Sequence, residues 1–302
     1  MGFGVPAQPV NGEEPHRSLA VYLARPNAGN KSIALTATLL ALGFAFYAMD
    51  ALPFACAAAL PVFALLLAAN KRLRVTGNGI CHKQTRIIAL LGAGVWCLTL
   101  LIGFAIALYR PASFNYPLIY TFTTPDFSLY ANLAKGLAGY LIVIWLYSSA
   151  PIHNRLSPLG STLAVSVGVT SVLVVAVLGF NIGWHPKLPS GVIWFALINL
   201  VITVTAEEAF FRLLIQDGLH KLLPKKLQAT PQAALWLAAG ASAFIFALAH
   251  APITHPTFLL FLCAGGIYAL AYQLTGRLSV AIATHFGVNV IHFLLLQYPL
   301  VL

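Results

Sequence analysis

Gly191-Val-Ile-Trp-Phe-Ala-Leu-Ile-Asn-Leu-Val-Ile-Thr-Val-Thr-Ala206 is a long apolar run that leads directly into Glu207-Glu208-Ala-Phe-Phe-Arg212. Two of the seven acidic residues of the chain therefore stand side by side at the end of a hydrophobic segment. A carboxylate in the hydrocarbon of a bilayer costs roughly 2.5–3.5 kcal/mol on insertion scales. Such residues are tolerated where they are paired, face a wet cavity or take part in chemistry, so the two glutamates indicate a functional site.

The rest of the chain has the same apolar character. Of its 302 residues 60% are hydrophobic and 8% are charged, whereas soluble domains average about 25% charged residues. The apolar runs are continuous rather than alternating, which favours helices over a transmembrane barrel. The sequence predicts an all-α, polytopic transmembrane helical bundle of eight or nine spans. Its nine apolar stretches are 32–49, 53–70, 87–108, 130–150, 162–183, 189–211, 233–251, 257–274 and 278–297.

The formal charge of +10 indicates contact with membrane lipids rather than with nucleic acid, because the basic residues lie in short loops between apolar runs. With nine crossings and the N-terminus in the cytoplasm, 14 of the 17 Lys and Arg residues fall on the inner side and two, Arg110 and Lys187, on the outer side. This asymmetry favours a cytoplasmic N-terminus and suggests a bacterial plasma membrane, with an endoplasmic reticulum membrane as the alternative. The remaining cation, Lys135, lies inside the fourth stretch and is interpreted as a snorkelling side chain.

Helix geometry gives the two glutamates different predicted roles. Glu208 and Arg212 are four residues apart with the glutamate first, which is the favoured order for an ion pair on a helix. Glu207 points about 100° away and has no cation nearby in the sequence. An unpaired carboxylate in a water-poor cleft suits a general base. We therefore assign chemistry to Glu207 and a supporting role to Glu208 and Arg212, although the opposite assignment of the two glutamates is also open.

Two further polar patterns lie on later apolar stretches. One is Phe246-Ala-Leu-Ala-His250, and the other is His285-Phe-Gly-Val-Asn289. His285 and Asn289 are again four apart, so both can project from one helix face and stabilise an oxyanion. Glu207, His250, His285 and Asn289 together make a site suited to hydrolysis of an amide by water. The set Glu207, His250 and His285 would equally satisfy a zinc ion with one open position.

The ordered set EExxxR, FxxxH and HxxxN, with Phe246 as the first residue of the second motif, resembles the CPBP family of intramembrane proteases. That family includes the CAAX prenyl endopeptidases and bacteriocin-processing relatives. The flanking segments Phe-Phe-Arg-Leu-Leu-Ile-Gln and Tyr272-Gln-Leu-Thr-Gly-Arg-Leu-Ser279 are similar as well, and the resemblance covers about residues 192–293. One departure is Leu213, where many members have glycine, but this position carries no catalytic group.

The resemblance implies hydrolysis of a peptide bond inside the membrane. It implies that Glu207 and His250 activate water and that His285 and Asn289 stabilise the oxyanion, through either a glutamic or a metal-dependent mechanism. The expected substrate is a membrane-associated peptide or protein, either lipidated or with a C-terminal membrane tail. The predicted organisation is a cytoplasmic arm (1–31), transmembrane helices of unassigned role (32–184) and a protease core (185–302).

The alternative is a non-enzymatic membrane protein that keeps these motifs as structure, such as a transporter, an immunity factor or a scaffold factor. Intramembrane ionisable residues also mark substrate pathways in transporters. The enzyme reading requires the four named side chains to converge. The predicted spans place Glu207 near the inner side and His250 near the outer end of its helix. The two can meet only if the helix that carries Glu207 is longer or tilted, if 213–232 partly re-enters the membrane, or if the seventh span begins later.

Overall fold

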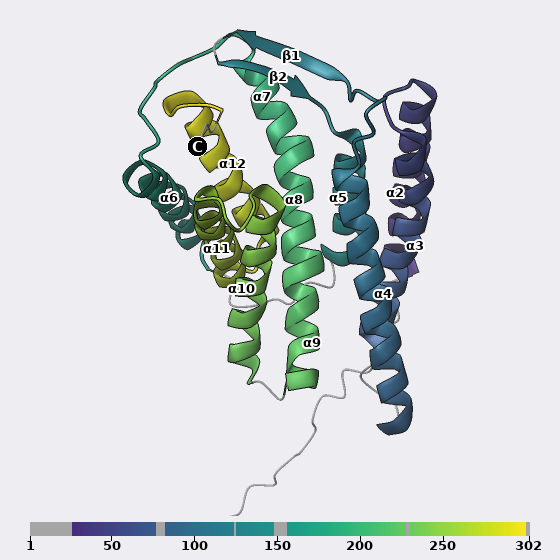
Figure 1. The fold of residues 1–302 in the computed structure, drawn as a ribbon. Coiled ribbons are helices and arrows are strands. Elements are labelled where there is room, and N and C mark those ends of the chain that lie inside the picture. Colours follow the sequence, from purple (N-terminus) through teal and green to yellow (C-terminus); the bar gives the residue numbers. More distant parts are fainter. Residues whose placement is uncertain (1–25, 77–81, 124, 148–155, 228–229, 300–302) are drawn as a thin grey trace, which may run out of the picture.

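The computed structural model describes residues 26–76, 82–123, 125–147, 156–227 and 230–299. Within these ranges the protein is a bundle of long helices with one small β-hairpin at one end (Figure 1). Most of the predicted N-terminal arm, up to residue 25, lies outside the described residues. The first described helix begins at Pro26, inside the segment predicted as the arm.

The N-terminal part of the bundle contains four helices and the hairpin. These elements are α2 (Pro26–Ala48), α3 (Phe54–Thr76), α4 (His82–Leu108), β1 (Leu118–Thr123), β2 (Asp126–Tyr130) and α5 (Leu133–Leu146). Asn132 begins α5 because its side chain accepts a hydrogen bond from the Lys135 backbone N–H, as N-cap residues do. Helix α5 packs against α2, α3 and α4 on one side and against the helix that carries the glutamates on the other.

The C-terminal part consists of long helices interrupted by π-helical turns. Its elements are α6 (Pro158–Val174), η2 (Val175–Gly179), α7 (Val192–Ile198), η3 (Asn199–Val204), α8 (Thr205–Glu208), η4 (Ala209–Gln216), α9 (Asp217–Leu227), α10 (Pro231–His250), α11 (Thr257–Thr275) and α12 (Leu278–Leu295). The elements from α7 to α9 follow one another without a break and form one long helix in the middle of the bundle (Figure 1). Helix α10 packs against α9, α11 and η4, and α12 packs against α6 and α11.

The prediction of a multi-pass helical membrane protein is confirmed. Eight helices in the described part of the chain are long and apolar enough to cross a membrane. The fourth predicted stretch, 130–150, forms α5, which has only 14 residues and is shorter than a full span. The orientation with a cytoplasmic N-terminus stays a prediction.

The helix that carries the glutamates is much longer than predicted. Its apolar segment runs from Val192 to Leu223 and has 32 residues, which at 1.5 Å per residue extends about 48 Å and exceeds the roughly 30 Å of bilayer hydrocarbon. The predicted end at residue 211 is therefore wrong. Glu207 is the 16th of these 32 residues, so it lies halfway along the helix rather than near its inner end. The expected mismatch in depth between Glu207 and His250 disappears.

An aromatic cluster joins the hairpin to the last helix. Phe195 of α7 stacks on Phe293 of α12 with ring centroids 3.9 Å apart, and Phe122 of β1 meets the same Phe293 edge-on at 5.3 Å. Phe122 and Phe293 are buried. The hairpin formed by β1 and β2 therefore packs against both the first turns of α7 and the C-terminal end of α12 (Figure 1).

Candidate active site

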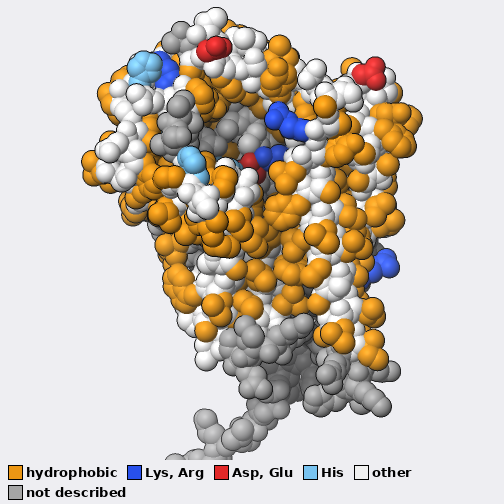
Figure 2. Space-filling view, viewed as in Figure 1, with side chains coloured by type: hydrophobic (Ala, Val, Ile, Leu, Met, Phe, Trp, Pro, Cys, Tyr) orange, Lys and Arg blue, Asp and Glu red, His pale blue; other side chains and the backbone are white. Residues whose placement is uncertain are grey.

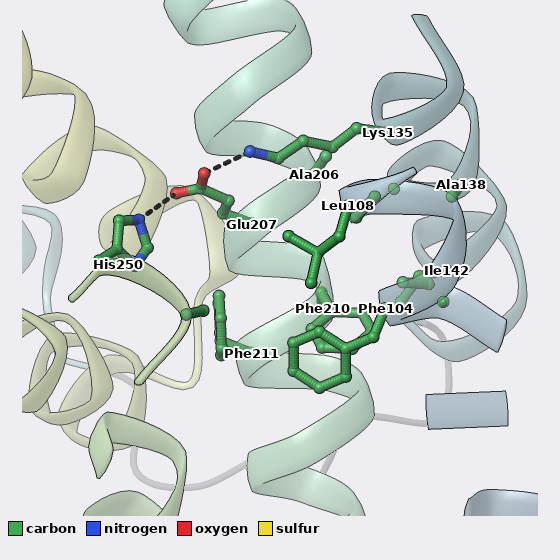
Figure 3. Close-up of a pocket in the computed structure, with 14 residues that line it drawn as sticks. Phe104, Leu108, Lys135, Ala138, Ile142, Ala206, Glu207, Phe210, Phe211 and His250 are labelled. Atoms are coloured by element: carbon green, nitrogen blue, oxygen red, sulfur yellow. Dashed lines mark hydrogen bonds and ion pairs between the residues drawn. The ribbon is translucent and has the colours of Figure 1, made fainter. Parts of the chain in front are cut away.

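Glu207 lies in the centre of the candidate site with polar groups on both sides of its carboxylate (Figure 3). Its Oε1 accepts a hydrogen bond from the ammonium of Lys135 on α5. Its Oε2 is 3.8 Å from His250 Nε2 and 3.7 Å from His285 Nε2. Both distances are too long for good direct hydrogen bonds, but they allow one water molecule to contact the carboxylate and an imidazole together.

Glu208 anchors a fully buried network behind Glu207. The side chains of Glu208 and Arg212 are both 0% exposed, and Arg212 Nε donates to Glu208 Oε2 over 2.8 Å. The ion pair that the i,i+4 spacing predicts is therefore present. The other Glu208 oxygen, Oε1, is 2.9 Å from His285 Nδ1. This contact fixes the His285 ring so that its Nε2 faces Glu207, as outer partners of functional histidines commonly do.

Arg212 also joins the network to neighbouring helices. Its Nη1 donates to Gln216 Oε1 at 3.1 Å and to Ser242 Oγ at 3.3 Å. Ser242 in turn donates to the Phe211 carbonyl at 2.8 Å. These contacts connect η4 to α10 and satisfy Nε and Nη1 of the buried guanidinium, whereas its Nη2 has no hydrogen-bond partner among the described residues.

His250 is held by the end of its own helix. Helix α10 ends at His250 because Pro252 follows shortly after, and residues before proline disfavour helical geometry. The His250 Nδ1 is 2.7 Å from the Phe246 carbonyl oxygen. A carbonyl only accepts, so this nitrogen carries the proton and the lone pair of Nε2 faces Glu207 when the ring is neutral.

Aromatic rings pack around both imidazoles. Phe246 stacks on His250 with ring centroids 4.2 Å apart and contacts the edge of His285 at 5.6 Å. Tyr268 of α11 stacks on the other side of His285 at 4.4 Å. Phe246 and Tyr268 are each 2% exposed. Phe246 therefore contacts both histidines, which fits the supporting role that its motif suggests.

The predicted residues meet in one cavity. A cavity of about 320 Å³ between α6, α10, α11 and α12 has Glu207, His250, His285 and Asn289 in its wall. Asn289 Nδ2 donates to Asn199 Oδ1 of η3 at 3.3 Å, so the amide is held toward the long helix. A smaller cavity of about 100 Å³ on the α4 and α5 side shares Glu207 and His250 with the first and adds Lys135. The Glu207–His250 pair thus lies between two hollows, and an acidic and a basic side chain are visible together in the apolar face of Figure 2.

The interpretation of Lys135 as a snorkelling residue is wrong. Its ammonium contacts the Glu207 carboxylate instead of reaching for a headgroup. Glu207 therefore has a cation partner, contrary to the view that it is unpaired. The only signal in the sequence is that Lys135 is the one charged residue between 131 and 150. No sequence rule connects it to a glutamate 72 positions further along.

The described residues do not form a ready metal centre. Nowhere in the described ranges are three His, Cys, Asp or Glu side chains grouped as metal ligands need to be. The ammonium of Lys135 on the Glu207 carboxylate would also repel a divalent cation bound there. The zinc site that the sequence leaves open, with Glu207, His250 and His285 as ligands, does not fit this arrangement.

Helical irregularity accompanies the site. The π-helical elements η3 and η4 lie directly before and after the single turn of α8 that carries both glutamates. Such turns inside α-helices are frequent at functional sites. Here they frame the turn from which Glu207 and Glu208 reach different partners.

Comparison with known proteins points to the same segment. Residues 189–291 match the sequence model of the family described as type II CAAX prenyl endopeptidase Rce1-like. The match includes both glutamates, Arg212, His250, His285 and Asn289. No curated protein and no solved structure matches the chain.

The eight apolar helices and the family match together indicate an integral, multi-pass membrane protein with a segment similar to membrane endopeptidases. Over residues 189–291 the chain is similar to the Rce1-like type II CAAX prenyl endopeptidases. The CPBP resemblance of the motifs is thereby confirmed for residues 189–291. The family implies a peptide or protein substrate in a membrane.

Proposed function

We propose that this protein hydrolyses a peptide bond of a membrane-associated peptide or protein, with Glu207 as the general base. The observation that carries the proposal is the position of Glu207 Oε2, 3.8 Å from His250 Nε2 and 3.7 Å from His285 Nε2 between two cavities. A carboxylate and an unprotonated imidazole nitrogen at this separation can hold one water between them. The protease core is assigned to residues 185–302.

The reaction begins with a water molecule that contacts Glu207 and His250. Glu207 Oε2 takes a proton from the water while the water oxygen forms a bond to the carbonyl carbon of the substrate. The electron pair of the carbonyl π bond moves to its oxygen and gives a tetrahedral oxyanion. The C–N bond then breaks, and the leaving nitrogen takes the proton from Glu207. One water is consumed, and one carboxyl group and one amine are produced.

His285 and Asn289 are assigned to the oxyanion. Asn289 has a second amide N–H besides the one that it donates to Asn199. His285 offers Nε2 to the same cavity because Glu208 holds its Nδ1. When this ring carries protons on both nitrogens, Nε2–H donates toward the oxyanion. Donors fixed in place before the reaction need no reorganisation, and one such donor contributes a factor of about 10² to 10³ in kcat.

The cavities favour a substrate with an apolar segment next to the cleaved bond. Most residues of the smaller cavity are apolar, including Phe104, Leu108, Ile142 and Phe210. A peptide that ends in a prenylated cysteine and three further residues matches this lining and the family description. The tail of a surface protein and a bacteriocin leader are the other substrate classes. We place the enzyme in a bacterial plasma membrane with a cytoplasmic N-terminus.

The decisive experiment compares purified wild type with Glu207→Gln in detergent or liposomes. An internally quenched peptide with a farnesylated C-terminal CAAX sequence is the first probe. The second probe is a set of peptides that are captured from cells on Glu207→Ala and identified by mass spectrometry. We expect Glu207→Gln to abolish cleavage and to remain folded by size-exclusion chromatography. Retained cleavage would show that Glu207 is not the base.

The chain offers a matched control for His250. His255 lies five residues later and is 2.8 Å from the Thr257 hydroxyl, outside the walls of both cavities. We expect His250→Gln to lose at least about a hundredfold in kcat. His255→Gln should stay within threefold of wild type. Equal losses in both variants would refute a specific role of His250. No cleavage of either probe by wild type would favour a non-enzymatic membrane protein.

A further inference from the structure

A cation from outside the family segment contacts the proposed base. Lys135 belongs to α5, whereas the family match covers residues 189–291. Its Nζ donates to Glu207 Oε1 and shares the wall of the smaller cavity with Glu207 and His250. Figure 3 shows Lys135 and His250 on opposite sides of the Glu207 carboxylate.

Glycines on α5 make this contact possible. A Cβ at Gly139 would lie 2.4 Å from the Ala206 Cα, so the two backbones touch at the residue that precedes Glu207. A Cβ at Gly136 would lie 3.3 Å from Ile202 Cγ2. Small residues permit such close helix packing in membranes. Lys135 and Gly139 are four apart and share one face of α5, so the close approach at Gly139 brings Lys135 next to Glu207.

The two acid–cation pairs of the site differ in their surroundings. Glu208 and Arg212 are both 0% exposed and are surrounded by helices. Glu207 and Lys135 are 11% and 22% exposed and line cavities. The first pair is suited to hold the fold together. The second lies where a substrate and a water molecule would react, so its charges are available to the reaction.

We propose that Lys135 is a positioning residue for the hydrolysis, which rests on the function proposed above. Its ammonium fixes one oxygen of the Glu207 carboxylate and leaves the other directed at the water. It also remains as a fixed positive charge when Glu207 takes a proton. The N-terminal helices, to which the sequence gives no role, thereby complete the active site through α5.

The charge balance of the reaction explains why a cation is needed here. Before the reaction, the negative charge is on Glu207 beside Lys135. When the proton of water moves to Glu207 and the water oxygen bonds to the carbonyl carbon, Glu207 becomes neutral and the carbonyl oxygen becomes negative. The total charge is unchanged, and the negative charge has moved only a short distance. In a water-poor cavity the ammonium stabilises the carboxylate before the reaction and continues to attract the negative charge after it has moved to the carbonyl oxygen.

Substitutions at Lys135 test the role of its charge. We expect Lys135→Met and Lys135→Gln to lower kcat about a hundredfold and to change KM by less than threefold. Lys135→Arg should retain at least a tenth of the wild-type kcat because it keeps the charge. The matched control is Lys71→Met, which removes a lysine placed over the Trp145 ring of the same α5. That variant should stay within threefold of wild type.

Chemical rescue separates charge from packing. Lys135→Cys treated with 2-bromoethylamine regains an ammonium on a side chain of nearly the original length, whereas iodoacetamide adds a neutral amide. We expect at least a tenfold recovery of kcat with the first reagent and none with the second. Wild type treated in parallel controls for the exposed Cys97 and Cys263.

The outcomes distinguish this inference from the proposed function. If Glu207→Gln is inactive but Lys135→Met and Lys135→Gln keep kcat within threefold of wild type, the role of Lys135 is refuted and the function stands. Equal activity after both reagents would refute it as well. If wild type cleaves neither the farnesylated peptide nor the peptides recovered on Glu207→Ala, both proposals fail. If the neutral variants do not fold, Lys135→Arg decides the question: at least a tenth of the wild-type kcat supports the role of the charge, and a folded but inactive Lys135→Arg refutes it.

Discussion

Replacing Arg212 with methionine tests whether the buried network behind Glu207 holds the bundle together. Arg212→Met removes the guanidinium and keeps an apolar side chain that is nearly as long as the methylene stem of arginine. It leaves the Glu208 carboxylate 0% exposed with His285 as its remaining partner among the contacts described for it. Breaking one side of a buried ion pair costs about 3–5 kcal/mol, because a charge stays buried without compensation.

The hydrogen bonds of Arg212 add to this cost. Its contacts with Gln216 and Ser242 are 3.1 and 3.3 Å long, and interhelical hydrogen bonds in membrane proteins average about 0.6 kcal/mol each. The expected total is therefore about 4–6 kcal/mol. Whole domains are stable by about 5–15 kcal/mol, so this one substitution removes a large part of the stability.

A double substitution separates the pair from the packing. In Glu208→Leu/Arg212→Met both charges are gone, and apolar replacements of buried ion pairs are often neutral or stabilising. We expect the double variant to recover at least about 2 kcal/mol relative to Arg212→Met alone. It should remain inactive, because His285 loses the carboxylate that orients it.

The assay is unfolding in mixed detergent micelles followed by tryptophan fluorescence. Trp96 is a local reporter, because its indole N–H donates to the Leu214 carbonyl of η4 at 2.8 Å. A loss below about 1 kcal/mol in Arg212→Met would mean that the pair is not structural. A double variant no more stable than Arg212→Met would show that the cost does not arise from the uncompensated Glu208 charge.

Three further predictions concern packing, pH and metals. Gly139→Ala forces a Cβ to within 2.4 Å of the Ala206 Cα, so the substitution should lower the free energy of unfolding by about 1–3 kcal/mol and kcat more than tenfold. The control is Gly94→Ala, because a Cβ at Gly94 would meet nothing within 4 Å. This variant should match wild type in a thermal-shift and a cleavage assay. Tyr116 lies outside the spans, and burial raises the pKa of its hydroxyl above the ordinary value. The contribution of the neutral Tyr116 to stability is therefore complete below the unfolded pKa of about 10 and is lost as the pH rises toward the folded pKa. Tyr116→Phe should unfold less readily at alkaline pH than wild type. Cleavage should be unchanged by EDTA or 1,10-phenanthroline, and a loss of activity that zinc restores would contradict the proposal that Glu207 activates the water as a general base without a metal.

Motifs on one helix could be interpreted from the sequence, since helix geometry alone decides which side chains share a face. The Glu208–Arg212 pair is an example, because only the spacing of four residues is needed. The residue at which that helix leaves the bilayer could not be predicted from the sequence in the same way. Arg212, Gln216 and Asp217 look like an exit from the bilayer, but all three are buried and bonded: Gln216 donates to the Ala269 carbonyl, and Asp217 accepts from Tyr272. Polarity signals a membrane boundary only when the partners of the polar groups are water.

The sequence by itself determined that the chain is a multi-pass helical membrane protein and which residues carry the family motifs, because apolar length and helical spacing are local properties. Only the tertiary structure decided that Glu207 lies halfway along a 32-residue helix and that its carboxylate lies between two histidines and Lys135 of α5. The partner of a buried charge depends on how closely helices far apart in the sequence pack. Here that distance is set by the absence of a side chain at Gly139.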